Sequence, residues 1–125
     1  MRLLVCGGRD LDPMKVWDWL EANAHETACD ALGRAQHVPF EVLIHGGASG
    51  ADEGAAQWAA ASEIQILRFP ADWKAHGRSA DPRRNARMLA EGKPDLVIAF
   101  PGGSGTADMV GRARGADVPV VRVEG

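Results

Sequence analysis

The chain has 125 residues, of which 46% are hydrophobic and 25% charged, and it carries a formal net charge of −3. A chain of this length is expected to fold as one domain, residues 1–125, and its acidic balance excludes a protein that holds nucleic acid by bulk positive charge. No apolar run approaches the ~20 residues that span a membrane and the N-terminus lacks the plan of a signal peptide, so we expect a soluble cytoplasmic protein without membrane contact.

Five short apolar runs, taken in chain order, predict five strands. The first, second and fourth runs are continuous and contain β-branched residues, which is typical of strands buried on both faces of a parallel sheet. The runs occupy residues 3–6, 42–45, 64–69, 96–100 and 118–123.

Two helices are predicted in the first half of the chain, where apolar residues recur at three- and four-residue spacing. The stripes consist of Trp17, Leu20, Ala24, Ala28 and Leu32 in the first helix and of Ala51, Ala55, Trp58 and Ala59 in the second. Gly33 is placed to end the first helix, because glycine adopts the left-handed conformation that often follows a helix.

Two more helices are predicted in the second half. Asp81 and Pro82 suit the N-cap and the first position of one helix, which residues 92–94 would end. Its inward face would carry Asn85, Met88 and Leu89. A shorter helix is expected over residues 106–114, with Gly115 as its stop. The alternation of strands and helices predicts an α/β fold, a three-layer sandwich with a mainly parallel sheet of about five strands.

Glycine is over-represented and clustered. There are 15 glycines, a share well above the average of about 7%. Three clusters, at residues 7–8, 46–50 and 102–106, each follow a predicted strand. The carboxyl ends of parallel strands share one edge of the sheet, where ligands bind, so we expect the three loops to meet there.

Glycine-rich turns that open a helix expose backbone N–H groups beside the positive end of the helix dipole, and so can hold a phosphate. The alternative is that these glycines only permit close packing of strand and helix; three clusters on one edge favour the anion site. The expected ligand-binding residues are Gly8, Arg9, Gly46, Gly47, Ser49, Gly102, Gly103, Ser104, Gly105 and Thr106. None of the loops is a P-loop or has the G-x-G-x-x-G spacing of dinucleotide-binding proteins.

A basic segment adds further candidates. Arg84 falls at the border of the buried face of its predicted helix and could clamp a phosphate, whereas Arg83 and Arg87 point toward solvent. Trp73 could stack on a base or cap the core.

Three residues are candidate acid–base groups. Asp52 and Asp108 lie in the first turns of predicted helices, where a carboxylate either interacts with the helix dipole or serves a sugar hydroxyl or a reaction. His45 ends a strand beside a glycine loop and is either catalytic or a hydrogen-bonded core histidine. Neither Cys6 nor Cys29 has metal-ligand spacing, and we expect neither a metal nor a cofactor.

Taken together, the motifs resemble the YspA/YAcAr-type members of the SLOG superfamily, which also contains the LOG and DprA proteins. The motifs that carry the resemblance lie at residues 7–10, 45–52, 71–73, 84–89 and 99–106. The resemblance implies a Rossmann-like sheet that binds a nucleotide or a nucleotide-derived ligand. Together with several tryptophans in a small chain, it also suggests a homodimer.

The LOG branch consists of phosphoribohydrolases that release the base from nucleoside 5′-monophosphates, and its motifs resemble residues 101–106 and Arg84 here. A glutamate stands three residues beyond the threonine of the LOG motif, but this chain has Met109 there, which can neither stabilise positive charge nor activate water. Asp108 is one residue away from that position, and Asp52 or Asp10 could substitute only from elsewhere.

The sequence therefore predicts a protein that binds a nucleotide or ribose-phosphate ligand. The alternative is an enzyme that hydrolyses the N-glycosidic bond of nucleoside 5′-monophosphates. A single-stranded nucleic-acid module is a third reading, against which the acidic net charge argues.

Overall fold

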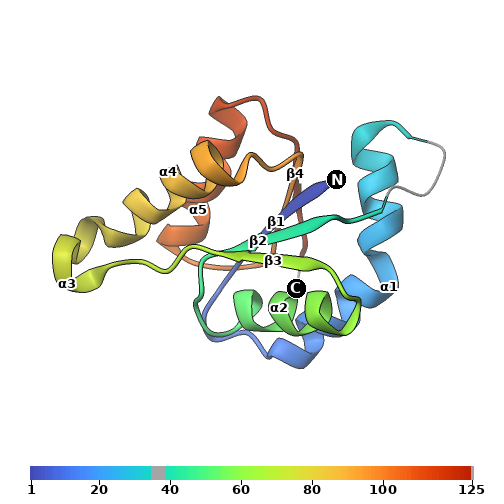
Figure 1. Ribbon diagram of the computed structural model, residues 1–125, viewed down its shortest axis with the longest axis horizontal. Coiled ribbons are helices and arrows are strands. Elements are labelled where there is room, and N and C mark those ends of the chain that lie inside the picture. The colour runs from blue at the N-terminus through green and yellow to red at the C-terminus, as the bar shows by residue number, and fades with distance from the viewer. Residues whose placement is uncertain (35–38, 125) are drawn as a thin grey trace.

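The computed structural model describes residues 1–34 and 39–124 of the chain. Its centre is a five-stranded sheet in the order β3-β2-β1-β4-β5, in which every neighbouring pair is parallel (Figure 1). The strands are β1 (Arg2–Cys6), β2 (Val42–His45), β3 (Gln65–Arg68), β4 (Leu96–Ala99) and β5 (Val120–Arg122). The expected α/β fold with a five-stranded parallel sheet is confirmed.

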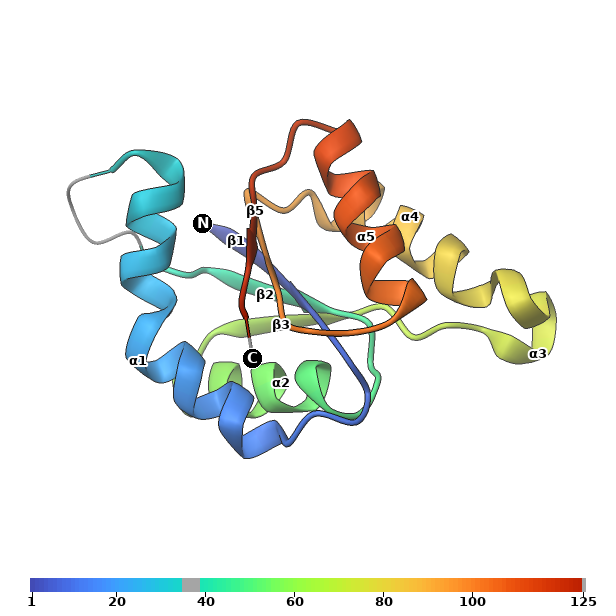
Figure 2. The same ribbon diagram turned by 180° about the vertical axis from the view of Figure 1, so that it is seen from behind.

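Helices cover both faces of the sheet and make the fold a three-layer sandwich. α1 (Pro13–Leu32) and α2 (Ala51–Ala61) pack against each other on one face, whereas α4 (Ala80–Gly92) and α5 (Ser104–Gly115) pack on the other (Figure 2). Within the described residues, no helix has both the length and the apolar character that a membrane crossing needs.

The central strand shows why the apolar runs are continuous. Leu3 and Val5 of β1 belong to the core beneath α1 and α2, whereas Leu4 and Cys6 belong to the core beneath α4 and α5. Because alternate side chains point to opposite faces, a strand covered on both sides needs apolar residues at every position. The two clusters form the two halves of the core.

Two helix starts differ from the prediction. Asp81 is not an N-cap: α4 begins at Ala80, and Asp81 lies in its first turn with its carboxylate accepting hydrogen bonds from arginines. A one-turn helix, α3 (Trp73–His76), and a 3₁₀ turn (Gly77–Ser79) precede α4. These short elements were not predicted, because a single turn is too short to show a periodic apolar stripe.

The other start that differs is that of α5, which begins at Ser104 instead of residue 106. The predicted end of the first helix is confirmed, since Gly33 follows α1 in the left-handed conformation with φ +64° and donates its N–H to the carbonyl oxygen of Asp30.

The order of the strands fixes where a ligand can bind. From β1 the chain moves outward to β2 and β3 and then returns to place β4 on the other side of β1. The order therefore reverses between β1 and β4, and in open parallel sheets the crevice beyond the carboxyl ends of such strands is the usual ligand site.

Candidate functional site

A cleft of about 440 Å³ lies at the expected place, beyond the carboxyl ends of β1 and β4. We call it the β1/β4 cleft. Gly8 and Arg9 line it from the loop after β1, and Pro101 and Gly103 from the loop after β4. Ala48 reaches it from the loop after β2. The three glycine-rich loops therefore meet on one rim, and the volume is typical of small-molecule sites.

The first turn of α5 faces this cleft with open backbone groups. Gly103, Ser104, Gly105 and Thr106 all line the cleft. No acceptor for the N–H groups of Ser104, Gly105 or Thr106 lies within the described part of the chain. A side chain on Gly103 would meet nothing within 4 Å. The turn therefore presents unpaired N–H groups and the positive end of the helix dipole to the cleft.

Gly102 has a packing role, in contrast to residues 103–106, which line the cleft. A Cβ atom there would collide with Thr106 and approach the backbone nitrogen of Gly8 to 2.8 Å. The N–H of Gly8 donates to the carbonyl oxygen of Pro101 at 2.8 Å. Gly102 therefore allows the loops after β1 and β4 to touch, which is the packing role that the sequence left open.

The loop after β2 uses its N–H groups internally. The N–H groups of Gly46 and Ala48 donate to Oδ2 of Asp52, at 3.1 and 3.2 Å, and the N–H of Gly47 donates to Nδ1 of His45 at 3.0 Å. In this conformation these N–H groups are not offered to a ligand, in contrast to those of α5.

Gly46 and Gly47 instead make room for arginines. A Cβ atom on Gly46 would collide with the guanidinium group of Arg84. A Cβ atom on Gly47, which has φ +76°, would lie 2.6 Å from Nε of Arg68. The absence of side chains on this loop therefore lets two positive charges lie against its backbone.

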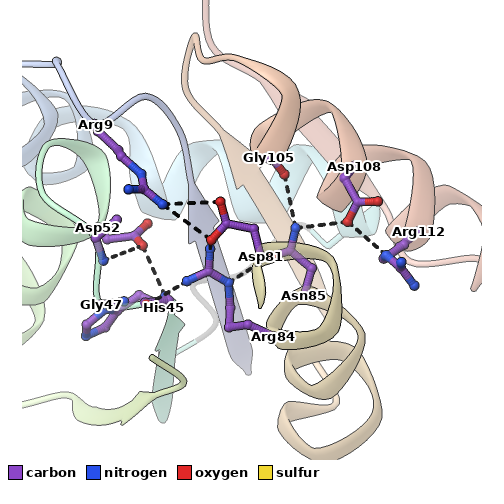
Figure 3. A network of polar contacts seen from close by, with 12 residues as sticks. Arg9, His45, Gly47, Asp52, Asp81, Arg84, Asn85, Gly105, Asp108 and Arg112 are labelled. Atoms are coloured by element: carbon purple, nitrogen blue, oxygen red, sulfur yellow. Dashed lines mark hydrogen bonds and ion pairs between the residues drawn. The ribbon is translucent and has the colours of Figure 1, made fainter. Parts of the chain in front are cut away.

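Arg84 is the centre of the polar network shown in Figure 3. It is buried, with 9% of its surface exposed, and donates from Nη1 to the carbonyl oxygen of Gly46 at 2.7 Å. Nε donates to Asn85 at 3.0 Å, and Nη2 donates to Asp81 at 2.9 Å. Arg9 reaches the same carboxylate from the opposite side at 3.2 Å. Asp81 therefore bridges two arginines that line the cleft.

Asp108 points away from the cleft. Its Oδ2 accepts from Asn85 at 3.0 Å and from Arg112 at 2.8 Å, and it does not line the cleft (Figure 3). Met109 is fully buried in the core. Neither residue brings a carboxylate to the cleft.

Asp52 and His45 are both buried, but only Asp52 lines the cleft. Burial raises the pKa of Asp52 to about 6, although the N–H of Ala48 and the charge of Arg84 act against the rise. Burial, together with the charges of Arg68 and Arg84, lowers the pKa of His45 to about 4. A cleft carboxyl with such a pKa is a candidate acid–base group, whereas His45 is neutral at pH 7.

The raised pKa of Asp52 and the lowered pKa of His45 predict an unusual pH dependence of stability. Between about pH 4 and 6.5 the unfolded state binds more protons at His45, so its contribution to the unfolding free energy rises with pH. Asp52 acts oppositely between pH 3.8 and about 6, because the folded state retains its proton longer. The two contributions partly cancel in the natural chain.

Asp52→Asn removes the contribution to the unfolding free energy that falls as pH rises. The amide of the variant keeps an oxygen that can accept hydrogen bonds from the N–H groups of the loop after β2. We expect the stability of this variant to rise more steeply over pH 4 to 6.5 than that of the natural chain. The expected difference is on the order of 1 kcal/mol or more, since a tenfold change in proton affinity corresponds to roughly 1.4 kcal/mol. Urea denaturation at a series of pH values measures this difference. Parallel stability curves would contradict the assignment.

A second pocket, of about 320 Å³, adjoins the cleft at the carboxyl ends of β2 and β3. We call it the β2/β3 pocket. Gly46, Gly47 and Ser49, which were expected to bind the ligand, lie on this pocket and not on the β1/β4 cleft, and Trp73 also lines it. Arg84 lines both.

The sequence did not identify Asp81 as a member of the site. Its spacing of three residues from Arg84 on one helix was an available signal, because residues so spaced are neighbours on a helix surface. Across the described residues, no group of three or more histidine, cysteine or acidic side chains is arranged to hold a metal ion.

Comparison with known proteins adds a family assignment to this geometry. Residues 1–76 match the family model described as YAcAr: YspA, cpYpsA-related SLOG family. The chain is also similar to the Gene 61 protein of Mycobacterium phage D29, with 33% identity over 129 residues that cover 96% of this chain and 94% of the relative. No solved structure matches the chain.

Proposed function

Because the chain belongs to the YspA, cpYpsA-related SLOG family, we propose that it binds a nucleotide or nucleotide-derived ligand in the β1/β4 cleft. The observation that carries this proposal is the first turn of α5, whose N–H groups are open to the cleft. A helix N-terminus of this kind suits a phosphate group without help from a cationic side chain.

The remaining walls suit the rest of such a ligand. Gly103, Ser104, Gly105 and Thr106 would hold the phosphate, with Gly102 shaping the turn. Gly8 would allow close approach from the opposite wall. Arg9 and Arg84 supply positive charge, and the carboxylates of Asp52 and Asp81 are acceptors of the kind that bind sugar hydroxyls.

Gly103→Asp is expected to weaken nucleotide binding without harming the fold. Aspartate is favoured at the N-cap position that Gly103 occupies, and a Cβ atom there meets no neighbour. Its carboxylate would take the N–H groups that the phosphate needs. Like charges a few Å apart near a protein surface repel by more than ~1.4 kcal/mol, so affinity should fall at least about tenfold.

The measurement is calorimetric titration with mono-, di- and cyclic nucleotides of all common bases. Gly111→Asp is the matched control, since it adds the same charge to the same helix at an open position outside the cleft. Equal nucleotide affinity in the natural chain and in Gly103→Asp would show that the phosphate does not bind at the first turn of α5. No binding by any nucleotide would overturn the proposed function.

A second candidate function is hydrolysis of the N-glycosidic bond of nucleoside 5′-monophosphates. The observation in its favour is Asp52, which lines the cleft and has a pKa raised by burial to about 6. A group with this pKa can give or take a proton near neutral pH. Asp108 and His45 remain weaker candidates for this role, because neither lines the cleft.

Chromatography of nucleoside monophosphates after incubation with the protein separates the two functions. Release of free base that is lost in Asp52→Asn and retained in Arg83→Ala would favour the enzyme. Tight binding without release would favour a ligand-binding protein. Salt-sensitive binding of single-stranded oligonucleotides would instead favour the third reading, a nucleic-acid module.

The homodimer suggested by the resemblance and the cytoplasmic location expected from the sequence remain part of this proposal. Sedimentation equilibrium of the purified chain measures the first, and a mass of one chain at all concentrations would contradict it.

A further inference from the structure

The β2/β3 pocket differs from the neighbouring cleft in the balance of its charges. Asp10, Asp52 and Asp81 line the β1/β4 cleft beside its two arginines. The β2/β3 pocket is lined by three arginines, Arg9, Arg68 and Arg84, and no aspartate or glutamate is among its lining residues in the described part of the chain. The second pocket is therefore the more positive of the two.

Arg68 supplies a positive charge that no acidic side chain pairs with among the residues that the structure describes. Arg68 is the last residue of β3, and its side chain is exposed. This side chain forms no hydrogen bond or ion pair within the described residues, although the backbone of Arg68 pairs with β2. Its guanidinium group lies against Gly47, where a side chain would collide with it. An arginine at a concave surface without an acidic partner is suited to binding an anion.

Trp73 and Arg9 form another wall of the same pocket. The side chain of Trp73 is 48% exposed, and the guanidinium carbon of Arg9 lies 5.4 Å from the centre of its ring. Arg9 also pairs with Asp81 on the side of the cleft. Contact with Trp73 and Asp81 holds this exposed arginine between the two pockets.

The two pockets adjoin on one rim of the sheet. Arg9, Ala48 and Arg84 line both of them. One ligand can therefore contact both sides of the Arg9–Asp81–Arg84 bridge, with one end in the cleft and the other against Arg68.

We propose that the β2/β3 pocket binds a second phosphate group of the ligand, separated by the sugar from the phosphate at α5. This inference rests on the proposed function of the cleft. The chemical class that it predicts is a nucleotide with two separate phosphates, of which the nucleoside 3′,5′-bisphosphates are the simplest examples. The guanidinium group of Arg68 can donate two parallel hydrogen bonds to a phosphate dianion, and Arg9 and Arg84 add positive charge to the same pocket.

Calorimetric titration of the full chain with nucleoside 5′-monophosphates and the corresponding 3′,5′-bisphosphates, for all four common bases, tests the proposal. We expect at least one bisphosphate to bind at least about tenfold more tightly than its monophosphate, which is the effect of one or more charge-assisted hydrogen bonds. In Arg68→Gln this gain is lost, while monophosphate affinity stays within about twofold. Arg114→Gln, which removes an exposed arginine from the other end of α5, should change neither affinity.

Tryptophan fluorescence locates the second phosphate. The bisphosphate should change the emission of the natural chain more than the monophosphate does, and Trp73→Phe should abolish this difference. Monophosphate binding with no gain from the second phosphate, or equal loss of both affinities in Arg68→Gln, would overturn the second subsite and leave the proposed function standing. If none of these nucleotides binds, the proposed function fails and the second subsite fails with it.

Discussion

Replacing Arg84 by alanine is expected to lower the free energy of unfolding by about 3–5 kcal/mol, the range for breaking a buried ion pair by removing one partner. The guanidinium group joins three separate places, since it donates to the backbone of Gly46, to Asn85 and to Asp81. Its charge also stabilises the buried carboxylate of Asp52. Without it, the buried carbonyl of Gly46 and the amide oxygen of Asn85 lose their donor, and Asp81 and Asp52 each lose one of the two arginine charges that act on them.

Urea denaturation at pH 7 measures this loss. Arg83→Ala is the matched control, because Arg83 directly precedes Arg84 in the same helix but is more exposed, and its side chain donates only to Ser79 among the described residues. Its removal should change stability by no more than about 0.5 kcal/mol. If Arg84→Ala also stayed within about 1 kcal/mol of the natural chain, the network would not be what holds the loops together.

Gly50→Ala is expected to cost about 2–5 kcal/mol, from two independent causes. Gly50 has φ +73° and ψ −117°, a backbone conformation outside the left-handed helical region, where a side chain costs at least roughly 1–2 kcal/mol. Its Cβ atom would also collide with the carbonyl oxygen of Gly8 and lie 2.7 Å from the carbonyl carbon and oxygen of Arg9. Those contacts are with backbone, so relief requires the loop after β1 to move away from α2, at a further cost of about 1–3 kcal/mol.

Gly33→Ala measures the cost of a side chain at positive φ in the absence of a collision. Gly33 has φ +64°, but a Cβ atom there would meet nothing within 4 Å. Thermal or urea denaturation of both variants should therefore give about 1–2 kcal/mol for Gly33→Ala and more for Gly50→Ala. Equal losses would show that the loops after β1 and β2 can separate without cost.

The sheet could be predicted because burial on both faces restricts the central strands to apolar residues. β1, β2 and β4 are buried on both faces, so their runs are continuously apolar and almost coincide with the observed strands. β3 and β5 are shorter than the predicted runs at residues 64–69 and 118–123. Each pairs with one neighbouring strand of only four residues, so the paired length is shorter than the apolar pattern.

The composition of the site could be predicted only in part. The meeting of the glycine loops follows from the parallel sheet alone. The internal use of the N–H groups of Gly46 and Ala48 could not be predicted from the sheet, because it depends on the conformation that brings the carboxylate of Asp52 within hydrogen-bond distance of them. The place of Asp81 depends on Arg9, 72 residues away in sequence, and a local pattern therefore indicated a helix cap.

The bridge formed by Arg9, Asp81 and Arg84 contains two guanidinium groups and one carboxylate, so it has a net positive charge before any ligand binds. Folding has already overcome the mutual repulsion of the two cations and has already stripped water from Arg84, which is buried. An anion that meets such a preorganised rim has little rearrangement left to drive, so more of its attraction is retained as affinity.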